Sequence, residues 1–249
     1  SGVVTDIKNL AMAEMPIYVV VAAVLSLLIL LLTMDSLVTP FIFLLGIGMA
    51  IVYNMGTNMV FGEISYITQA LTAILQLGVT MDYSIFLLNS YEENKKRFPG
   101  EKERAMGHAI ANTFKSVVGS SVTTVAGFIA LCVMTFALGR DLGIVMAKGV
   151  FIGVLSTVTI FPAFLLVFDK LVFKTKHKPI IPSFNVVKNF VVKHYKIILL
   201  VALVIAYPAY YGNAHVKSYY NLTKDLPQDL KSCVANSELS DEFDLVASK

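Results

Sequence analysis

Residues 75–88 read LQLGVTMDYSIFLL, an apolar stretch that places one carboxylate, Asp82, inside a segment able to cross a membrane as a helix. The segment stays apolar beyond Asp82, and the next charged residue is Glu92. A carboxylate near the bilayer centre costs roughly 2.5–3.5 kcal/mol on insertion scales, so by default it marks an ion or proton path. The stretch therefore predicts a transmembrane helix that carries a titratable group.

Helical spacing gives Asp82 polar neighbours. Gly78, Asp82 and Asn89 fall near one line of the helix, and an adjacent line, at steps of seven, carries Gln69, Gln76, Tyr83 and Ser90. Gly78 leaves room over the carboxylate for water or for a facing helix. The structural alternative is that Asp82 snorkels or caps a helix end, but it lies about two turns inside the boundary, beyond the reach of a short side chain.

The composition is that of an integral membrane protein. Of 249 residues, 56% are hydrophobic and 15% are charged, and the mean hydropathy is +0.72. The net charge of +3 is too small and too scattered to indicate a nucleic-acid partner. The two cysteines do not predict a disulfide framework, because Cys132 lies in an apolar segment and Cys233 in a polar tail.

Hydropathy predicts an all-α membrane protein, a bundle of six transmembrane helices. Each apolar segment is long enough to cross about 30 Å of hydrocarbon. The predicted spans lie near residues 16–34, 38–57, 65–91, 113–138, 144–168 and 195–214. We expect the first five to form one bundle within residues 15–168.

The basic residues predict the topology. Most of the 20 Lys and Arg lie in two loops, near residues 95–115 and 170–196, which the positive-inside rule places in the cytoplasm. The first loop contains a predicted amphipathic surface helix near 101–112, and the second belongs to a cytoplasmic linker at 169–194. Residues 1–14 and 215–249 then face outward, as the end of one extracytoplasmic domain and the truncated start of another.

Stripes of small and hydroxyl residues mark the fourth and fifth predicted spans. Such stripes let helix backbones approach closely in lipid, and hydroxyls that face Asp82 could also serve a relay. Plain packing is the competing interpretation. The positions expected to pack near Asp82 are Gly78, Ser120, Thr123, Thr124, Gly127, Gly149 and Gly153. No nucleotide-binding loop, metal motif or nucleophile with a base occurs in the sequence, so neither an enzyme nor a metal site is predicted.

Two motifs resemble a known superfamily. GVTMDYSIFLL from Gly78 and SSVTTVAGF from Ser120, separated by a basic loop, are similar to the resistance-nodulation-division (RND) transporters and, within them, to MMPL-type exporters of lipids and hydrophobic compounds. The resemblance extends from residue 11 to about residue 230. It implies two similar halves, each with one helix, a large extracytoplasmic domain and five more helices. This chain would cover helices two to seven, an RND-type half plus the first helix of the second half.

The resemblance also implies a function. Asp82 and Tyr83 match the pair that takes part in proton relay, so the chain would belong to a multi-pass exporter of the plasma membrane. It would be driven by the proton gradient, without a cofactor. The implied partners are membrane lipids, a hydrophobic or amphiphilic substrate and the missing half of the transporter, or a second copy of the chain. The family's tenth helix carries a matching pair, and this sequence holds no second pair.

Two other functions fit a similar plan of helices. The five-helix bundle also resembles the sterol-sensing segment of Patched-like and Niemann-Pick-like proteins, in which lipid recognition regulates the protein. A protein-export accessory of the SecD and SecF kind shares the same arrangement. The pair Asp82 and Tyr83 favours the exporter.

Overall fold

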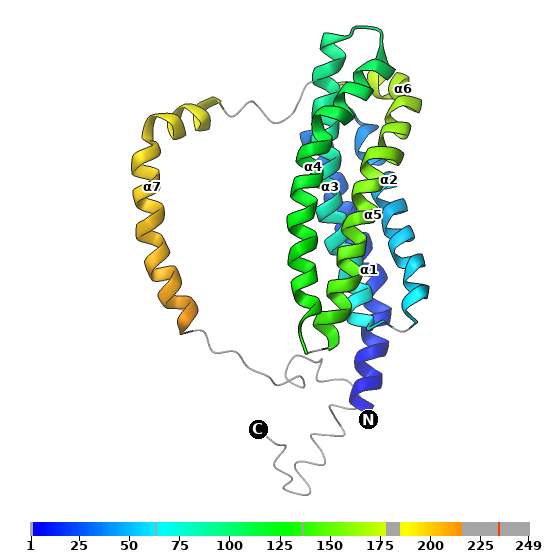
Figure 1. Ribbon diagram of the computed structural model, residues 1–249, viewed down its shortest axis with the longest axis vertical. Helices are drawn as coiled ribbons and strands as arrows, with labels where there is room; N and C mark the ends of the chain where they lie inside the picture. Colours follow the sequence, from blue (N-terminus) through cyan, green and yellow to red (C-terminus); the bar gives the residue numbers. More distant parts are fainter. Residues whose placement is uncertain (1, 63, 136, 178–184, 216–233, 235–249) are drawn as a thin grey trace, which may run out of the picture. The chain divides into compact units, whose positions relative to one another are not determined.

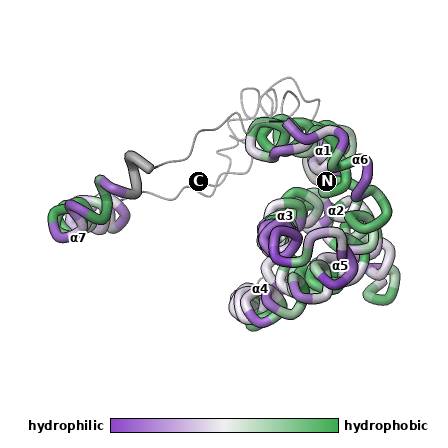
Figure 2. The backbone as a smooth tube through the Cα atoms, turned by 90° about the horizontal axis from the view of Figure 1, so that it is seen from above, coloured by the Kyte–Doolittle hydropathy of each residue, from purple (hydrophilic) through white to green (hydrophobic). Residues whose placement is uncertain are grey.

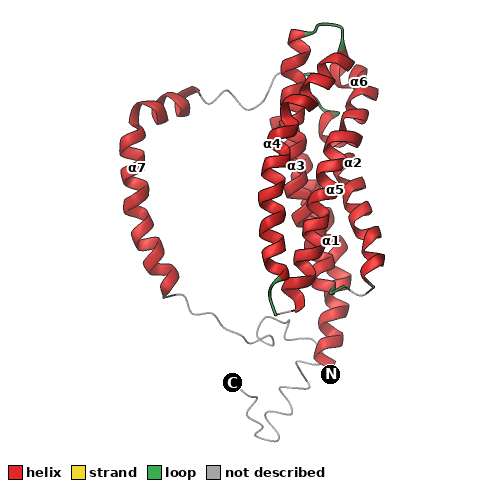
Figure 3. Cartoon of the chain, in the orientation of Figure 1, coloured by secondary structure: helices red, strands yellow, loops and turns green. Residues whose placement is uncertain are grey.

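The structure is a computed structural model that describes residues 2–62, 64–135, 137–177, 185–215 and 234. Within these residues it contains α-helices and one short 3₁₀ helix, and no strand (Figure 1, Figure 3). The chain divides into two compact units, one of residues Lys8–Ile180 and one of Ser1–Ile7 with Ile181–Lys249. The site discussed below lies in the first unit.

The helices follow the apolar segments of the sequence. They are α1 (Gly2–Thr33), α2 (Thr39–Gly56), η1 (Thr57–Phe61), α3 (Tyr66–Arg97), α4 (Lys102–Cys132), α5 (Ala137–Val167), α6 (Asp169–Lys174) and α7 (Asn185–Ala214). Six helices of the described chain are long and apolar enough to cross a membrane. The predicted fold class, an all-α bundle with six potential spans, is therefore confirmed.

Local sequence signals explain several helix ends. Pro40 lies in the first turn of α2, where its missing N–H removes no helical hydrogen bond. The Ser65 side chain accepts a hydrogen bond from the Ile67 N–H at 3.3 Å and so caps α3. Between α3 and α4 the chain reverses at Gly100, whose φ of 86° is a positive value that glycine adopts without steric strain. These signals fix the short connections that hold α2 to α5 side by side.

The bundle of α2 to α5 buries polar as well as apolar side chains and is apolar outside. Viewed along the bundle, α3 lies among α2, α4 and α5, and it contacts all three (Figure 2). Large apolar side chains such as Phe86, Ile129 and Phe151 point outward and are more than half exposed. The buried polar residues include Asn54, Thr68, Thr72, Gln76, Thr80, Ser84, Ser156 and Thr157. An apolar exterior and a set of buried polar residues are expected where lipid surrounds the helices and polar groups must find partners within the protein.

A hydrophobic cluster closes the end of the bundle at which α3 ends and α4 begins. Phe43 of α2 and Phe161 of α5 meet edge to face, with ring centroids 4.6 Å apart and an angle of 77°. Leu87 and Leu88 of α3 belong to the same cluster, and so does Met106 of α4. The cluster has members on each of α1 to α6 and therefore joins six helices at one end.

The fourth span begins earlier than the sequence analysis placed it. The amphipathic segment near 101–112 is the first part of α4 and runs into the span without a break. Ala105, Met106 and Ala109 are buried, and the same face continues through Val117 and Ser121, so one stripe packs along the whole helix. The span ends at Cys132 instead of residue 138, and α5 starts at Ala137 instead of residue 144.

The other predicted boundaries differ in detail. Helix α1 starts at Gly2, so residues expected to end an extracytoplasmic domain are already helical. The linker predicted at 169–194 contains α6 and the start of α7, and residues 178–184 lie outside the described part. In α7 the helical geometry is interrupted at His194, with φ −118° and ψ 20°, directly before the predicted sixth span. Of residues 215–249, only His215 and Val234 are described.

Candidate functional site

Asp82 lies near the middle of α3 on its outward face. It is exposed, as are Gly78, Phe86 and Asn89, which follow the same face at helical spacing. Asp82 makes no hydrogen bond or ion pair with any residue that the structure describes. An alanine-sized side chain at position 78 would meet nothing within 4 Å. The carboxylate therefore sits on an open, largely apolar face of a membrane-spanning helix.

Tyr83 points the other way. Because successive residues of a helix are about 100° apart, Tyr83 turns into the bundle and is only 3% exposed. It packs with Val117 of α4 and with Val150 and Val154 of α5. Its hydroxyl has no hydrogen-bond partner among the described residues. The two members of the predicted pair are thus neighbours in sequence but occupy different surroundings.

The small residues of α4 line an outward face. Ser120, Thr123 and Gly127 are exposed, and Thr124 is half-buried. The hydroxyls of both threonines donate to the Ser120 carbonyl, at 2.8 Å from Thr123 and 3.0 Å from Thr124, so they satisfy their own helix. Nothing lies within 4 Å of a Cβ built on Gly127. These residues leave the α4 surface open to a close neighbour.

Two glycines of α5, Gly149 and Gly153, allow close contact with α2 and α3. A Cβ built on Gly149 would lie 2.5 Å from Asn54 Nδ2, and one on Gly153 would lie 2.6 Å from Thr80 Oγ1. Both distances are far below ordinary contact, so a side chain at either position would push the helices apart. Gly149 and Gly153 therefore pack against Gln76 and Thr80, on the buried side of α3, and not against Asp82.

A buried polar cluster, which the sequence analysis did not anticipate, joins α2, α3 and α5. Asn54 Nδ2 donates to Gln76 Oε1 at 2.8 Å, and Gln76 Nε2 donates to the carbonyl oxygens of Ala50 and Gly149, both at 3.2 Å. A four-residue repeat of polar residues in α3 is the sequence signal that could have revealed it. The repeat consists of Thr68, Thr72, Gln76, Thr80 and Ser84.

Lys148 of α5 extends this cluster to η1. Its ammonium donates to the Asn54 carbonyl and to Thr57 Oγ1, both at 2.9 Å, and to Asn58 Oδ1. These acceptors belong to the last turn of α2 and to η1. A cation is favoured there because the carbonyl end of a helix carries partial negative charge.

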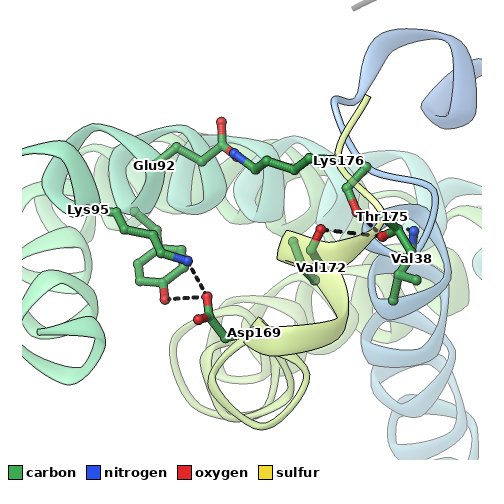
Figure 4. A network of polar contacts seen from close by, with 9 residues as sticks. Val38, Glu92, Lys95, Asp169, Val172, Thr175 and Lys176 are labelled. Atoms are coloured by element: carbon green, nitrogen blue, oxygen red, sulfur yellow. Dashed lines mark hydrogen bonds and ion pairs between the residues drawn. The ribbon is translucent and has the colours of Figure 1, made fainter. Parts of the chain in front are cut away.

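Ion pairs and hydrogen bonds connect the helix ends that surround α6 (Figure 4). Asp169 at the start of α6 accepts from Lys95 Nζ and, at 3.1 Å, from the Tyr91 hydroxyl. Lys176 pairs with Glu92 at 3.1 Å. A cavity of about 270 Å³ lies among these residues and the apolar side chains beneath them. The network holds the segment after α5 against α3.

The same segment also contacts the turn between α1 and α2. Ser36 Oγ and Thr175 Oγ1 are 2.9 Å apart, and the Leu37 N–H donates to the Thr175 carbonyl at 3.4 Å. The His177 N–H donates to the Asp35 carbonyl at 2.8 Å. Residues 169–177, which follow α5, therefore connect the end of α3 with the turn between α1 and α2. Across the described residues, no group of three or more His, Cys, Asp or Glu could hold a metal ion.

The long apolar helices and the apolar exterior define an integral membrane protein built as a helical bundle, with a carboxylate on a helix long enough to span the membrane. Comparison with known proteins gives the family. The model of the MMPL family matches residues 1–192, so the chain belongs to that family, as the resemblance to RND transporters predicted. This is a family of transporters.

Curated relatives are membrane proteins from bacteria and an archaeon. The chain is 31% identical over 127 residues to the membrane protein ActII-3 of Streptomyces coelicolor, covering 51% of the chain and 18% of that protein. It is 33% identical over 97 residues to the membrane protein MJ1562 of Methanocaldococcus jannaschii, covering 39% and 24%. Membrane protein YdfJ of Bacillus subtilis is 24% identical over 140 residues, covering 55% and 19%. The chain thus spans roughly a fifth of the length of the relatives it matches.

Proposed function

We propose that the chain forms part of an exporter of the plasma membrane, driven by the proton gradient, that moves lipids, amphiphiles or hydrophobic drugs. Asp82 takes up and releases the coupling proton, and Tyr83 assists the transfer. No cofactor other than the gradient is required. The proposal extends the transporter-like role that membership of the MMPL family supports.

The position of Asp82 is the observation that carries the proposal. Asp82 lies near the middle of α3, which runs from Tyr66 to Arg97, so either end of the helix is roughly 23 Å away at 1.5 Å per residue. An ionised carboxylate held at this depth without a partner is costly, and it is retained where a proton or ion must pass. Protonation removes the charge and most of that cost, which gives the site two states that differ in free energy.

The open face around Asp82 supports a second half as partner. Gly78 and Gly127 leave free space on α3 and α4, and small residues of this kind let another helix approach closely. A facing helix would exclude lipid from Asp82 and would supply the hydrogen bonds that the described residues do not. The missing half of the transporter, or a second copy of the chain, would fill this role.

Tyr83 provides a hydroxyl on the other side of the same helical turn. The hydroxyl is buried and has no hydrogen-bond partner among the described residues, and a polar atom in this position is stabilised when a water molecule bonds to it. We assign it the role of receiving a water molecule when the helices around it separate. Proton transfer between Asp82 and the two sides of the membrane would then follow the opening of the bundle.

Proton-coupled efflux in membrane vesicles tests the proposal. The full-length protein is compared with Asp82→Asn, which keeps the shape of the side chain and removes its titration, and the signal is normalised to inserted protein. We expect Asp82→Asn to lose coupled efflux and to insert normally. The control is Glu93→Gln on the same helix, because Glu93 is an exposed partner of Arg97 beyond the apolar stretch. Normal coupled efflux by Asp82→Asn would end the proton-relay proposal.

A further inference from the structure

Gln76 is the most completely bonded polar side chain inside the bundle. It is fully buried, and its amide bonds to three groups on two other helices: the Asn54 side chain and the carbonyl of Ala50 on α2, and the carbonyl of Gly149 on α5. Both N–H groups of the Gln76 amide are used. Gln76 therefore connects α3 to α2 and to α5 at a single level.

The packing around this amide leaves no freedom. A Cβ on Gly149 would lie 2.5 Å from Asn54 Nδ2 and 3.2 Å from Gln76 Oε1. Only glycine at position 149 lets the two amides lie against the α5 backbone. The hydrogen bonds are thus held in one arrangement by the approach of the helices.

The geometry of α3 links this cluster to Asp82. Asp82 follows Gln76 by six residues, which is about 9 Å along the axis and about 120° around it. A rotation of α3 about its axis would carry Asp82 away from the outward face, and the same rotation would break the hydrogen bonds of Gln76. Buried amides that lose their partners in apolar surroundings are strongly disfavoured.

The contact of α3 with α4 is of a different kind. Around Tyr83 it is formed by apolar side chains, among them Val117 and Val125 of α4, and the Tyr83 hydroxyl is left without a partner. The hydrogen bond found between the two helices is that of Ser90 Oγ to the Ala109 carbonyl, long at 3.5 Å and near the cytoplasmic end. This interface can shift at a smaller cost than the interfaces that Gln76 joins.

We propose that Gln76, held by Asn54, is the positioning residue that fixes the rotation of α3 and so keeps Asp82 on the outward face of the bundle. Helices α2, α3 and α5 are then held together at this level, whereas α4 meets α3 around Tyr83 through an apolar contact. The inference rests on the proposed function in one respect: the rotation of α3 matters for transport because it sets the position of Asp82. The rotation itself can be measured without transport.

The experiment compares Gln76→Leu with Thr72→Val in the full-length protein. Both side chains are 0% exposed on the same face of α3, but Thr72 bonds only to the Thr68 carbonyl of its own helix. Each variant also carries a single cysteine, at Phe86 or at Leu87, in a background whose native cysteines are replaced. Phe86 is 58% exposed and Leu87 is 1% exposed within this bundle, so a change in the ratio of their reactivities toward a membrane-permeant maleimide, relative to the wild-type ratio, reports a rotation of α3.

We expect Gln76→Leu to lower the ratio of the thiol reactivity at position 86 to that at position 87 by about tenfold. The reason is that losing these hydrogen bonds removes most of the preference for one rotation of α3. Thr72→Val should keep the wild-type ratio. In coupled efflux, Gln76→Leu should shift the pH profile, whereas Thr72→Val should leave it unchanged. A merely structural role for Gln76 would lower the amount of inserted protein and leave both the ratio and the pH profile as they are.

A second variant covers failure of Gln76→Leu to insert. Gly149→Ala keeps both amides and displaces them, and it should change the thiol ratio in the same direction, with Gly119→Ala, which meets nothing within 4 Å, as control. An unchanged ratio in these variants, or an equal change in Thr72→Val, overturns the inference. If Asp82→Asn retains coupled efflux, the proposed function fails, and the thiol ratio still decides whether Gln76 fixes the rotation.

Discussion

Substituting Gly153 tests the close contact between α3 and α5. A Cβ at this position would lie 2.6 Å from Thr80 Oγ1 and 3.4 Å from Thr80 Cγ2, whereas ordinary contact begins at 3.4 Å. The distance between the new methyl carbon and Thr80 Oγ1 must therefore increase by 3.4 − 2.6 = 0.8 Å. Rotating the Thr80 side chain brings little relief, because a β-branched residue in a helix has few allowed rotamers and its methyl group is already in contact. Helix α5 must retreat instead.

Overpacking of this kind typically costs about 1–3 kcal/mol, and the better helix propensity of alanine returns up to about 1 kcal/mol. We expect Gly153→Ala to lower the free energy of unfolding by about 1–2 kcal/mol in a detergent or bicelle titration. Gly127→Ala has open space and should raise it by up to about 1 kcal/mol through the helix propensity alone. Equal effects of the two substitutions would refute the tight contact at Gly153.

Three further predictions concern other parts of the bundle. Tyr83→Phe should leave the free energy of unfolding unchanged or raise it by up to about 1 kcal/mol, because it removes an unpaired buried hydroxyl, while coupled efflux falls. Asp169→Asn should lower stability in the same titration by about 1 kcal/mol, since Lys95 loses its partner at a partly exposed site; a larger loss would indicate a deeper role. A single cysteine at Arg97 should react with membrane-impermeant thiol reagents added from inside, and one at Gly62 with reagents added from outside. Labelling of position 97 from outside would contradict the predicted topology.

The sequence was sufficient for what depends on neighbours along the chain. Long apolar runs predicted the six potential spans, because hydropathy and length are local properties. The ends of α4 and α5 were less accurate, since no glycine or proline separates the surface part of α4 from its span, and the buried stripe through Ala105 and Val117 continues across the predicted border. Helix ends of this kind depend on packing partners, which the local pattern does not contain.

The candidate site divides in the same way. Helical spacing separated Asp82 from Tyr83, and the structure puts one outside and the other inside the bundle. The partners of Gln76 lie 26 and 73 residues away on other helices, so no periodic pattern along α3 could identify them. The stripes on α4 and α5 were read alike from the sequence. Yet Gly149 is buried and Gly127 is open, because the two helices turn different faces to the bundle.

The tie between Ser36 and Thr175 has a consequence for the order of folding. The two residues are 139 positions apart, so the contact closes a loop that contains the whole of α2 to α5. At synthesis rates of 5–20 residues per second, the turn after α1 waits roughly 7–28 s for its partner to be made. Any interaction that holds this turn in place during that time must form without the hydrogen bond between Ser36 and Thr175. A nascent chain stalled before Thr175 should leave Ser36 accessible to protease and thiol reagents, and release of the stall should protect it.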